Sequence, residues 1–184
     1  RDRCDSGAMR ARLLRLDGDG VHEHRPILGV GPEAGWAWLD LDVSPEDVAD
    51  VAQLLAPLEL DALAVADAVA DRDVPKFDDF GSHLLLVLHG LRDSALVTYE
   101  VDAFVTPQTL VTIREGRSPS IDALWDRCLT DPGTAPTRPD ELLARLADIL
   151  TRRLLTVVEV FDDRIELLVD AALRADPALL EALT

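Results

Sequence analysis

The alternation of apolar and polar positions divides the amino-terminal part of the chain into short strand-like stretches. Residues 36–41, WAWLDL, place aromatic and aliphatic residues between Gly35 and a helix-start signal, which predicts a strand. Residues 10–16 alternate well enough to predict a second strand. The segment 17–20, DGDG, follows it and has the composition of a tight turn.

Two helices are predicted next. Ser44 is placed to cap the first helix, Pro45 falls in its first turn, and Asp47 occupies the capping-box position. That helix stops at Pro57, and the following one is expected over residues 60–71. It carries Asp67 among small apolar neighbours, one turn before Asp71. This like-charge pair is mildly unfavourable, and either a cation or an arginine such as Arg72 would relieve it.

The middle of the chain predicts a meander of β-strands. Residues 84–91 form a continuous apolar run, which suits a central strand covered on both faces. Strands over 96–105 and 109–114 follow after the short connections 92–94 and 106–108. Connections this short are most simply those of an antiparallel meander. A further helix is expected to start at Ser118-Pro119, followed by a loop over 131–139.

The longest predicted element is a helix from about residue 139 to 174. Its apolar stripe recurs in steps of three and four residues, at Leu146, Leu150, Leu154, Val157, Phe161, Ile165 and Leu168. A stripe sustained for about six turns predicts a helix that packs against another long helix. Asp176-Pro177 breaks this pattern, and residues 178–183 are expected to begin a second helix.

Composition and charge narrow the class of protein. The chain has 184 residues, 48% of them hydrophobic, which suits one folded domain with a substantial core. Thirty-five acidic residues against eighteen Lys and Arg give a net charge of −17, which disfavours nucleic-acid binding. This charge is compatible with divalent cations, although an acidic surface also simply favours solubility.

The cysteine content and the lack of targeting or membrane segments indicate the cellular compartment of the protein. Cys4 and Cys128 are too few for a disulfide framework or a zinc site, so a reducing compartment is expected. No stretch approaches 18 consecutive apolar residues and no signal peptide is evident, so the chain as given is expected to be soluble. Residues 1–8 are interpreted as a tail, with Met9 as the natural start.

Apart from Asp67, the sequence contains few candidate catalytic or metal-binding residues. His22 and His24 would share a face only on a strand, and with no third ligand near them we expect an exposed loop. Asp78-Asp79 with His83 could be acid/base machinery, but a charged loop followed by a strand-edge histidine is the preferred interpretation. The chain contains no G-x-S-x-G, P-loop, G-x-G-x-x-G or Cys/His metal spacing, so we expect no enzyme activity.

The order of several motifs resembles the cytosolic amino-terminal domain of the CorA family of magnesium and cobalt channels. The matching stretches are WLDL at 38–41, LAVADAV at 63–69, VPKFDDFGSHLLLVL at 74–88, FVTPQTLVTIRE at 104–115 and LADILTRRLLTVVEVFDDRIELL at 146–168. The resemblance implies an α/β (α+β) fold: an α/β/α sandwich with a mixed, largely antiparallel sheet, followed by long C-terminal helices. The implied division is a tail at 1–8, the α/β cytosolic domain at 9–136, and the long helix with the start of a stalk hairpin at 137–184.

The resemblance also implies a function. Members of this family are homopentamers that control their gate with divalent ions held between neighbouring subunits. The matching carboxylates here are Asp67 and Asp148, and Ala66 stands where relatives commonly have Glu, which removes one carboxylate. The family's partner acid lies on a stalk helix, and its pore signature and two membrane helices follow it. All of these would lie beyond Thr184. The resemblance therefore places the fragment on the cytoplasmic side of the membrane, and only the missing C-terminal spans would connect it to the membrane.

Several alternatives remain open at this stage. Asp148 could simply pair with Arg145 or Arg152, and this structural role is preferred for it, whereas the ligand role is preferred for Asp67. The regulatory ion is expected to be Mg²⁺, bound weakly by the fragment, with Co²⁺ or Zn²⁺ as other candidates because zinc transporters share the domain. A stand-alone soluble interaction module with the same fold is the alternative to a channel domain.

Overall fold

The chain folds around one mixed β-sheet. A computed structural model of the chain describes residues 9–26, 35–70, 74–92 and 97–173. Seven strands in these ranges form the sheet in the order β2-β1-β3-β7-β6-β5-β4. They are β1 (Arg10–Asp17), β2 (Gly20–His24), β3 (Trp36–Asp42), β4 (Lys76–Asp79), β5 (Leu84–Arg92), β6 (Val97–Val105) and β7 (Thr109–Arg114). Within this sheet β3 and β7 pair in parallel and all other neighbours pair antiparallel.

The first hairpin confirms the turn at 17–20 and corrects one prediction. The Asp17 carboxylate accepts a hydrogen bond from the Asp19 N–H at 2.9 Å, and Gly20 has a φ of 132°, which a residue with a side chain rarely adopts. The prediction of a loop at His22 and His24 is wrong. Both lie on the edge strand β2, because the tight turn brings residues 20–24 back along β1 in antiparallel register.

The predicted meander is confirmed by β5, β6 and β7. Leu85 and Val87 of β5 are buried on one face, while its alternate leucines pack against the core on the other face. The charged loop predicted at Asp78-Asp79 is wrong, since these residues belong to the edge strand β4, paired with β5. Charged side chains are common on edge strands because they discourage pairing with other chains.

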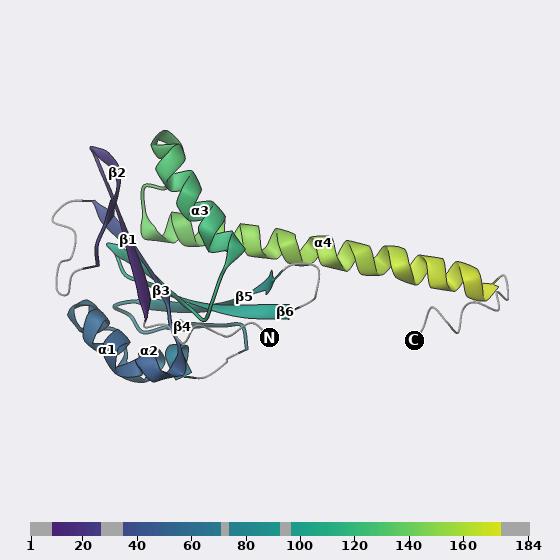
Figure 1. The fold of residues 1–184 in the computed structure, drawn as a ribbon, viewed down its shortest axis with the longest axis horizontal. Helices are drawn as coiled ribbons and strands as arrows, with labels where there is room; N and C mark the ends of the chain where they lie inside the picture. Colours follow the sequence, from purple (N-terminus) through teal and green to yellow (C-terminus); the bar gives the residue numbers. More distant parts are fainter. Residues whose placement is uncertain (1–8, 27–34, 71–73, 93–96, 174–184) are drawn as a thin grey trace, which may run out of the picture.

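One face of the sheet is covered by α1 (Val48–Leu55) and α2 (Ala62–Ala70) (Figure 1). A 3₁₀ turn at Pro45–Asp47 precedes α1, and the Asp47 carboxylate accepts the Ser44 N–H at 2.8 Å, as the predicted capping box requires. The α2 helix begins two residues later than predicted. The reason is that the Asp61 carboxylate caps it, accepting the Ala64 N–H at 2.9 Å.

The other face is covered by α3 (Pro119–Thr130) and the first half of α4 (Pro139–Leu173). Leu142, Leu146 and Leu150 are buried against the sheet, together with Trp38 and Trp125 from β3 and α3. Beyond these turns α4 extends clear of the sheet as a single helix (Figure 1). Its exposed apolar residues are Leu155, Val158, Val160, Phe161, Ile165, Leu167 and Val169.

The α/β/α sandwich with a mixed, largely antiparallel sheet and a long C-terminal helix is therefore confirmed. The expected tail at 1–8, the end of the second predicted helix at Asp71, the turn at 93–94 and the helix start at 178–183 lie outside the described residues. Across the described ranges, no helix combines the length and the apolar character that a membrane span requires.

Candidate functional site

Asp67 lies on the outer face of α2. Ala64, Val65 and Val69 of this helix are buried against the sheet, and the helical period places Asp67 on the opposite, solvent-facing side. Its carboxylate forms no hydrogen bond or ion pair with another described residue. Asp67 is thus an accessible carboxylate on α2, and no described residue is bonded to either of its oxygens.

Asp148 lies on α4, one turn before Arg152. Its Oδ2 accepts a hydrogen bond from Arg152 Nε at 2.7 Å, and this hydrogen bond raises the pKa of the Arg152 guanidinium. Both side chains are more than half exposed, at 57% for Asp148 and 75% for Arg152. A solvated i,i+4 pair of this kind stabilises a helix only slightly, and it matches the structural role predicted for Asp148.

The sheet separates the two predicted ligands. Asp67 belongs to the α1/α2 layer and Asp148 to the α3/α4 layer, on opposite faces of the sheet (Figure 1). One copy of the chain therefore does not bring them to a common ion. Throughout the ranges that the structure covers, no three His, Cys, Asp or Glu side chains gather closely enough to hold a metal.

A buried ionic network, which sequence reasoning missed, is centred on Asp40 of β3. The carboxylate is fully buried and accepts four hydrogen bonds from three neighbours. Arg12 Nε lies 2.8 Å and Arg114 Nη2 2.9 Å from Oδ2, while Thr112 Oγ1 lies 2.7 Å and Arg114 Nε 3.3 Å from Oδ1. Because donors occupy both oxygens, Asp40 has no free position for a metal ion.

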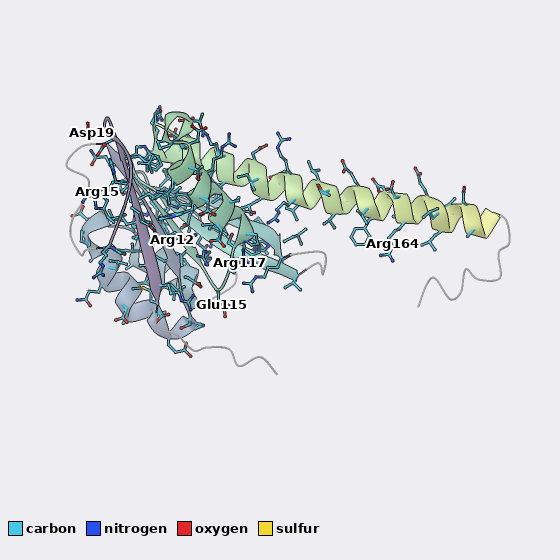
Figure 2. All side chains as sticks on the ribbon, turned by 45° about the horizontal axis from the view of Figure 1, so that its top comes forward. Arg12, Arg15, Asp19, Glu115, Arg117 and Arg164 are labelled. Carbon is cyan, nitrogen blue, oxygen red and sulfur yellow. The ribbon has the colours of Figure 1, made fainter. Side chains whose placement is uncertain are left out.

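The network ties β1, β3 and β7 to the start of α3. Arg12 also donates to Asp122 of α3 at 2.9 Å, and its guanidinium lies over the Trp125 ring, 4.4 Å from the centroid (Figure 2 labels Arg12). Burial alone would lower the pKa of Arg114, but the charge and hydrogen bonds of Asp40, together with the charges of Asp42 and Asp122, raise it. The network is closed and structural rather than a binding site.

A signal for this network exists in the sequence. Asp40 lies two residues after Trp38 in WLDL, so both side chains are on the same, core-facing side of the strand. Arg114 lies two residues after Thr112 in TLVTIR and has the same relation to it. A charged residue at a core position of one strand needs an opposite charge at a core position of a neighbour. The parallel register that pairs Asp40 with Thr112 was not predicted, so the partners could not be matched.

The enzyme candidate at Asp78, Asp79 and His83 does not form an acid/base arrangement. His83 is buried, its Nε2 accepts the Asp61 N–H at 3.3 Å, and its Nδ1 lies 3.1 Å from Ser82 Oγ. Its ring stacks on Phe80, with centroids 4.7 Å apart. Both ring nitrogens are engaged, and the Nε2 contact ties the β4–β5 hairpin to the residue before α2.

The chain is similar in sequence to a family of metal transporters. A family model described as CorA-like Mg²⁺ transporter protein matches residues 33–182. A curated relative from Bacillus subtilis, "Putative metal ion transporter YfjQ", is 27% identical over 134 residues. That match covers 73% of this chain and 41% of the relative, so the chain spans less than half of the relative's length.

Solved structures share the fold. The full-length CmaX protein matches with a TM-score of 0.72 and 19% identity, over 94% of this chain and 54% of CmaX. The CorA magnesium transporter from Methanocaldococcus jannaschii matches with 0.70 and 15% identity, over 93% of this chain and 54% of that protein. The ZntB cytoplasmic domain from Vibrio parahaemolyticus matches with 0.69 and 14% identity, over 96% of this chain and 70% of that domain.

Proposed function

The chain belongs to the family of CorA-like Mg²⁺ transporter proteins, and on this premise we propose that it is the cytosolic regulatory domain of a divalent cation transporter. In this proposal Mg²⁺ binds at acidic sites between subunits and biases the gate of the assembled protein. The single observation that carries the proposal is the position of Asp67, exposed on α2 and without a partner among the described residues.

An exposed carboxylate of this kind suits an ion shared between molecules. Mg²⁺ keeps several of its waters and takes one or two carboxylates, so each subunit needs to supply only a sparse set of ligands. Asp148 of the same chain is on the far side of the sheet and already pairs with Arg152. The remaining ligands of an ion at Asp67 would therefore come from another subunit or from a part of the protein beyond these residues.

Ion binding at such a site would act by changing the relative populations of two arrangements of the subunits. Two acidic surfaces that approach each other repel, and a bound cation offsets that repulsion only in the arrangement where it touches both. Loss of the ion would then favour the arrangement in which the subunits separate. Ala66, beside Asp67, supplies no second carboxylate, so the site would bind Mg²⁺ more weakly than one with two adjacent acids.

The distal half of α4 supports self-association. We propose that the protein assembles as the homopentamer of the family. Seven exposed large apolar residues follow Leu154 along this helix, and Leu167 is 70% exposed. A helix that projects from its domain with this much apolar surface is stabilised when other helices cover it. We propose that these helices belong to the same protein and lie on the cytoplasmic side of the membrane.

The choice of Mg²⁺ rests on donor chemistry rather than on fold. The CorA and ZntB matches have TM-scores of 0.70 and 0.69, so the fold does not distinguish between the cations in those proteins' names. Carboxylate oxygen is the hard donor that Mg²⁺ prefers, and the described residues of α2 include no histidine or cysteine beside Asp67. A regulatory role, rather than catalysis, also fits the engaged nitrogens of His83.

The proposal is tested on the full-length protein by limited proteolysis with and without Mg²⁺. Asp67→Asn keeps the side-chain volume and removes the charge, so it should weaken the protection that Mg²⁺ gives. The matched control is Asp50→Asn, an exposed aspartate on α1 in the same layer, which should leave protection intact. Equal protection of the Asp67→Asn and native proteins would remove Asp67 from the regulatory site.

A further inference from the structure

His22 and His24 stand side by side on the edge strand β2. Both side chains are exposed, and their ring centroids lie 6.4 Å apart in an edge-to-face arrangement. Neither imidazole forms a hydrogen bond or ion pair with another described residue. Residues i and i+2 of a strand project from the same face, so the two rings are held together by the backbone itself.

The sheet register identifies what surrounds the pair. His22 is opposite Arg15 and His24 is opposite Leu13, so these four side chains share one face of the hairpin. Asp17 is on the same face, diagonal to His22 and opposite Gly20, which has no side chain. Nε2 of His22 lies 3.8 Å from where a Cβ on Gly20 would stand, so the glycine places no side-chain atom against this nitrogen.

We propose that His22 and His24 form a two-nitrogen chelate for a borderline divalent transition metal, with Zn²⁺ as the representative ion. Neutral imidazole is a preferred ligand of Zn²⁺, with a Zn–N distance of about 2.0–2.1 Å. Two imidazoles on one tetrahedral ion have ring centroids about 5 Å apart. The observed 6.4 Å therefore needs only a small rotation of two exposed side chains.

Water molecules would complete the coordination. Asp17 is on the same face, but one of its oxygens already accepts the Asp19 N–H at 2.9 Å, and no third side chain among the described residues is close enough to serve as a ligand. Arg15 opposes binding because its positive charge is on the same face, opposite His22. The result is a weak, open site whose affinity the neighbouring charges set.

This site differs in chemistry from the one proposed at Asp67. Nitrogen ligands favour transition metals over Mg²⁺, which takes oxygen ligands almost exclusively. The hairpin would therefore bind Zn²⁺ even in excess Mg²⁺, and its occupancy would be independent of the Asp67 carboxylate.

The test is calorimetric titration of the 184-residue chain with Zn²⁺ in the presence of excess Mg²⁺. His22→Asn and His24→Asn should each weaken Zn²⁺ binding at least about tenfold, because loss of a direct ligand should cost no less than loss of an outer-shell partner. Arg15→Gln should tighten binding, since it removes the opposing charge. His89→Asn, a change at the half-buried histidine of β5, is the matched control and should leave the affinity unchanged.

Two outcomes would overturn the proposal. If His22→Asn and His24→Asn bind Zn²⁺ as the native chain does, the ion is bound elsewhere. If only one of them weakens binding, the two histidines do not act as a chelate. Far-UV circular dichroism of each variant verifies that the hairpin substitutions leave the fold intact.

Discussion

Asp40→Asn should destabilise the domain far more than any exposed charge change. Asparagine keeps the volume of the side chain but removes the negative charge that compensates Arg12 and Arg114. The Arg114 side chain is only 7% exposed, so its charge would remain buried without its main partner. Removing one member of a buried ion pair costs about 3–5 kcal/mol, against a total stability of about 5–15 kcal/mol for a typical domain.

The chain provides a control ion pair with a similar N–O distance and different burial. The Arg152–Asp148 pair has an N–O distance of 2.7 Å, close to the 2.8 Å of Arg12–Asp40. Asp148 is 57% exposed, however, whereas the Asp40 carboxylate is fully buried. Exposed pairs contribute at most about 1 kcal/mol, so Asp148→Asn should change stability little. Any difference between the two variants then comes from the burial of Asp40 and its larger number of partners, and not from the N–O distance.

Urea unfolding followed by tryptophan fluorescence measures the effect. Trp38 donates to Thr112 inside the network at 3.1 Å, and Trp125 packs against Trp38, so both report directly on this region. With a urea dependence of about 2 kcal/mol per molar, the midpoint of Asp40→Asn should fall by roughly 2 M. A midpoint shift no larger than that of Asp148→Asn would refute the claim that the network is buried and tightly coupled.

Two further predictions concern the sheet and the proposed sensor. Gly90→Ala should destabilise the domain by about 1–3 kcal/mol in urea unfolding, because a Cβ there would lie 2.4 Å from Tyr99 Cζ on the neighbouring strand. Gly18→Ala, with no atom within 4 Å of the added Cβ, should leave the midpoint within the error of the native value. In the full-length protein, Ala66→Glu should lower the Mg²⁺ concentration that protects against proteolysis, since it adds a carboxylate beside Asp67. An unchanged or higher concentration would contradict the proposed ion site.

The sequence predicted the elements with strong local signals. The meander was predictable because its strands are apolar runs separated by short connections, and α4 because its apolar stripe keeps a helical period over many turns. The strand at His22 and His24 was missed because its identity comes from pairing with β1 and not from its own composition. For the same reason, the edge strand β4 was mistaken for a loop at Asp78-Asp79.

The candidate site was predictable in part. The sequence identified Asp67 as a candidate carboxylate within a predicted helix. It also named Arg145 and Arg152 as possible partners of Asp148, and Arg152 is the one that pairs with it. That the two acids lie on opposite faces of the sheet depends on the order of strands and the direction of each crossover. Those are long-range properties, as is the parallel pairing of β3 and β7 that assembles the Asp40 network. A local sequence pattern encodes neither the order of the strands, nor the direction of the crossovers, nor the parallel pairing.

The most direct test of the central claim is calorimetric titration of Mg²⁺ into the 184-residue chain and into the full-length protein. The account predicts weak binding by the chain, tighter binding by the full-length protein, and loss of that difference in full-length Asp67→Asn. Sub-micromolar Mg²⁺ binding by the 184-residue chain as a monomer would contradict it, because such affinity requires a complete site within one copy.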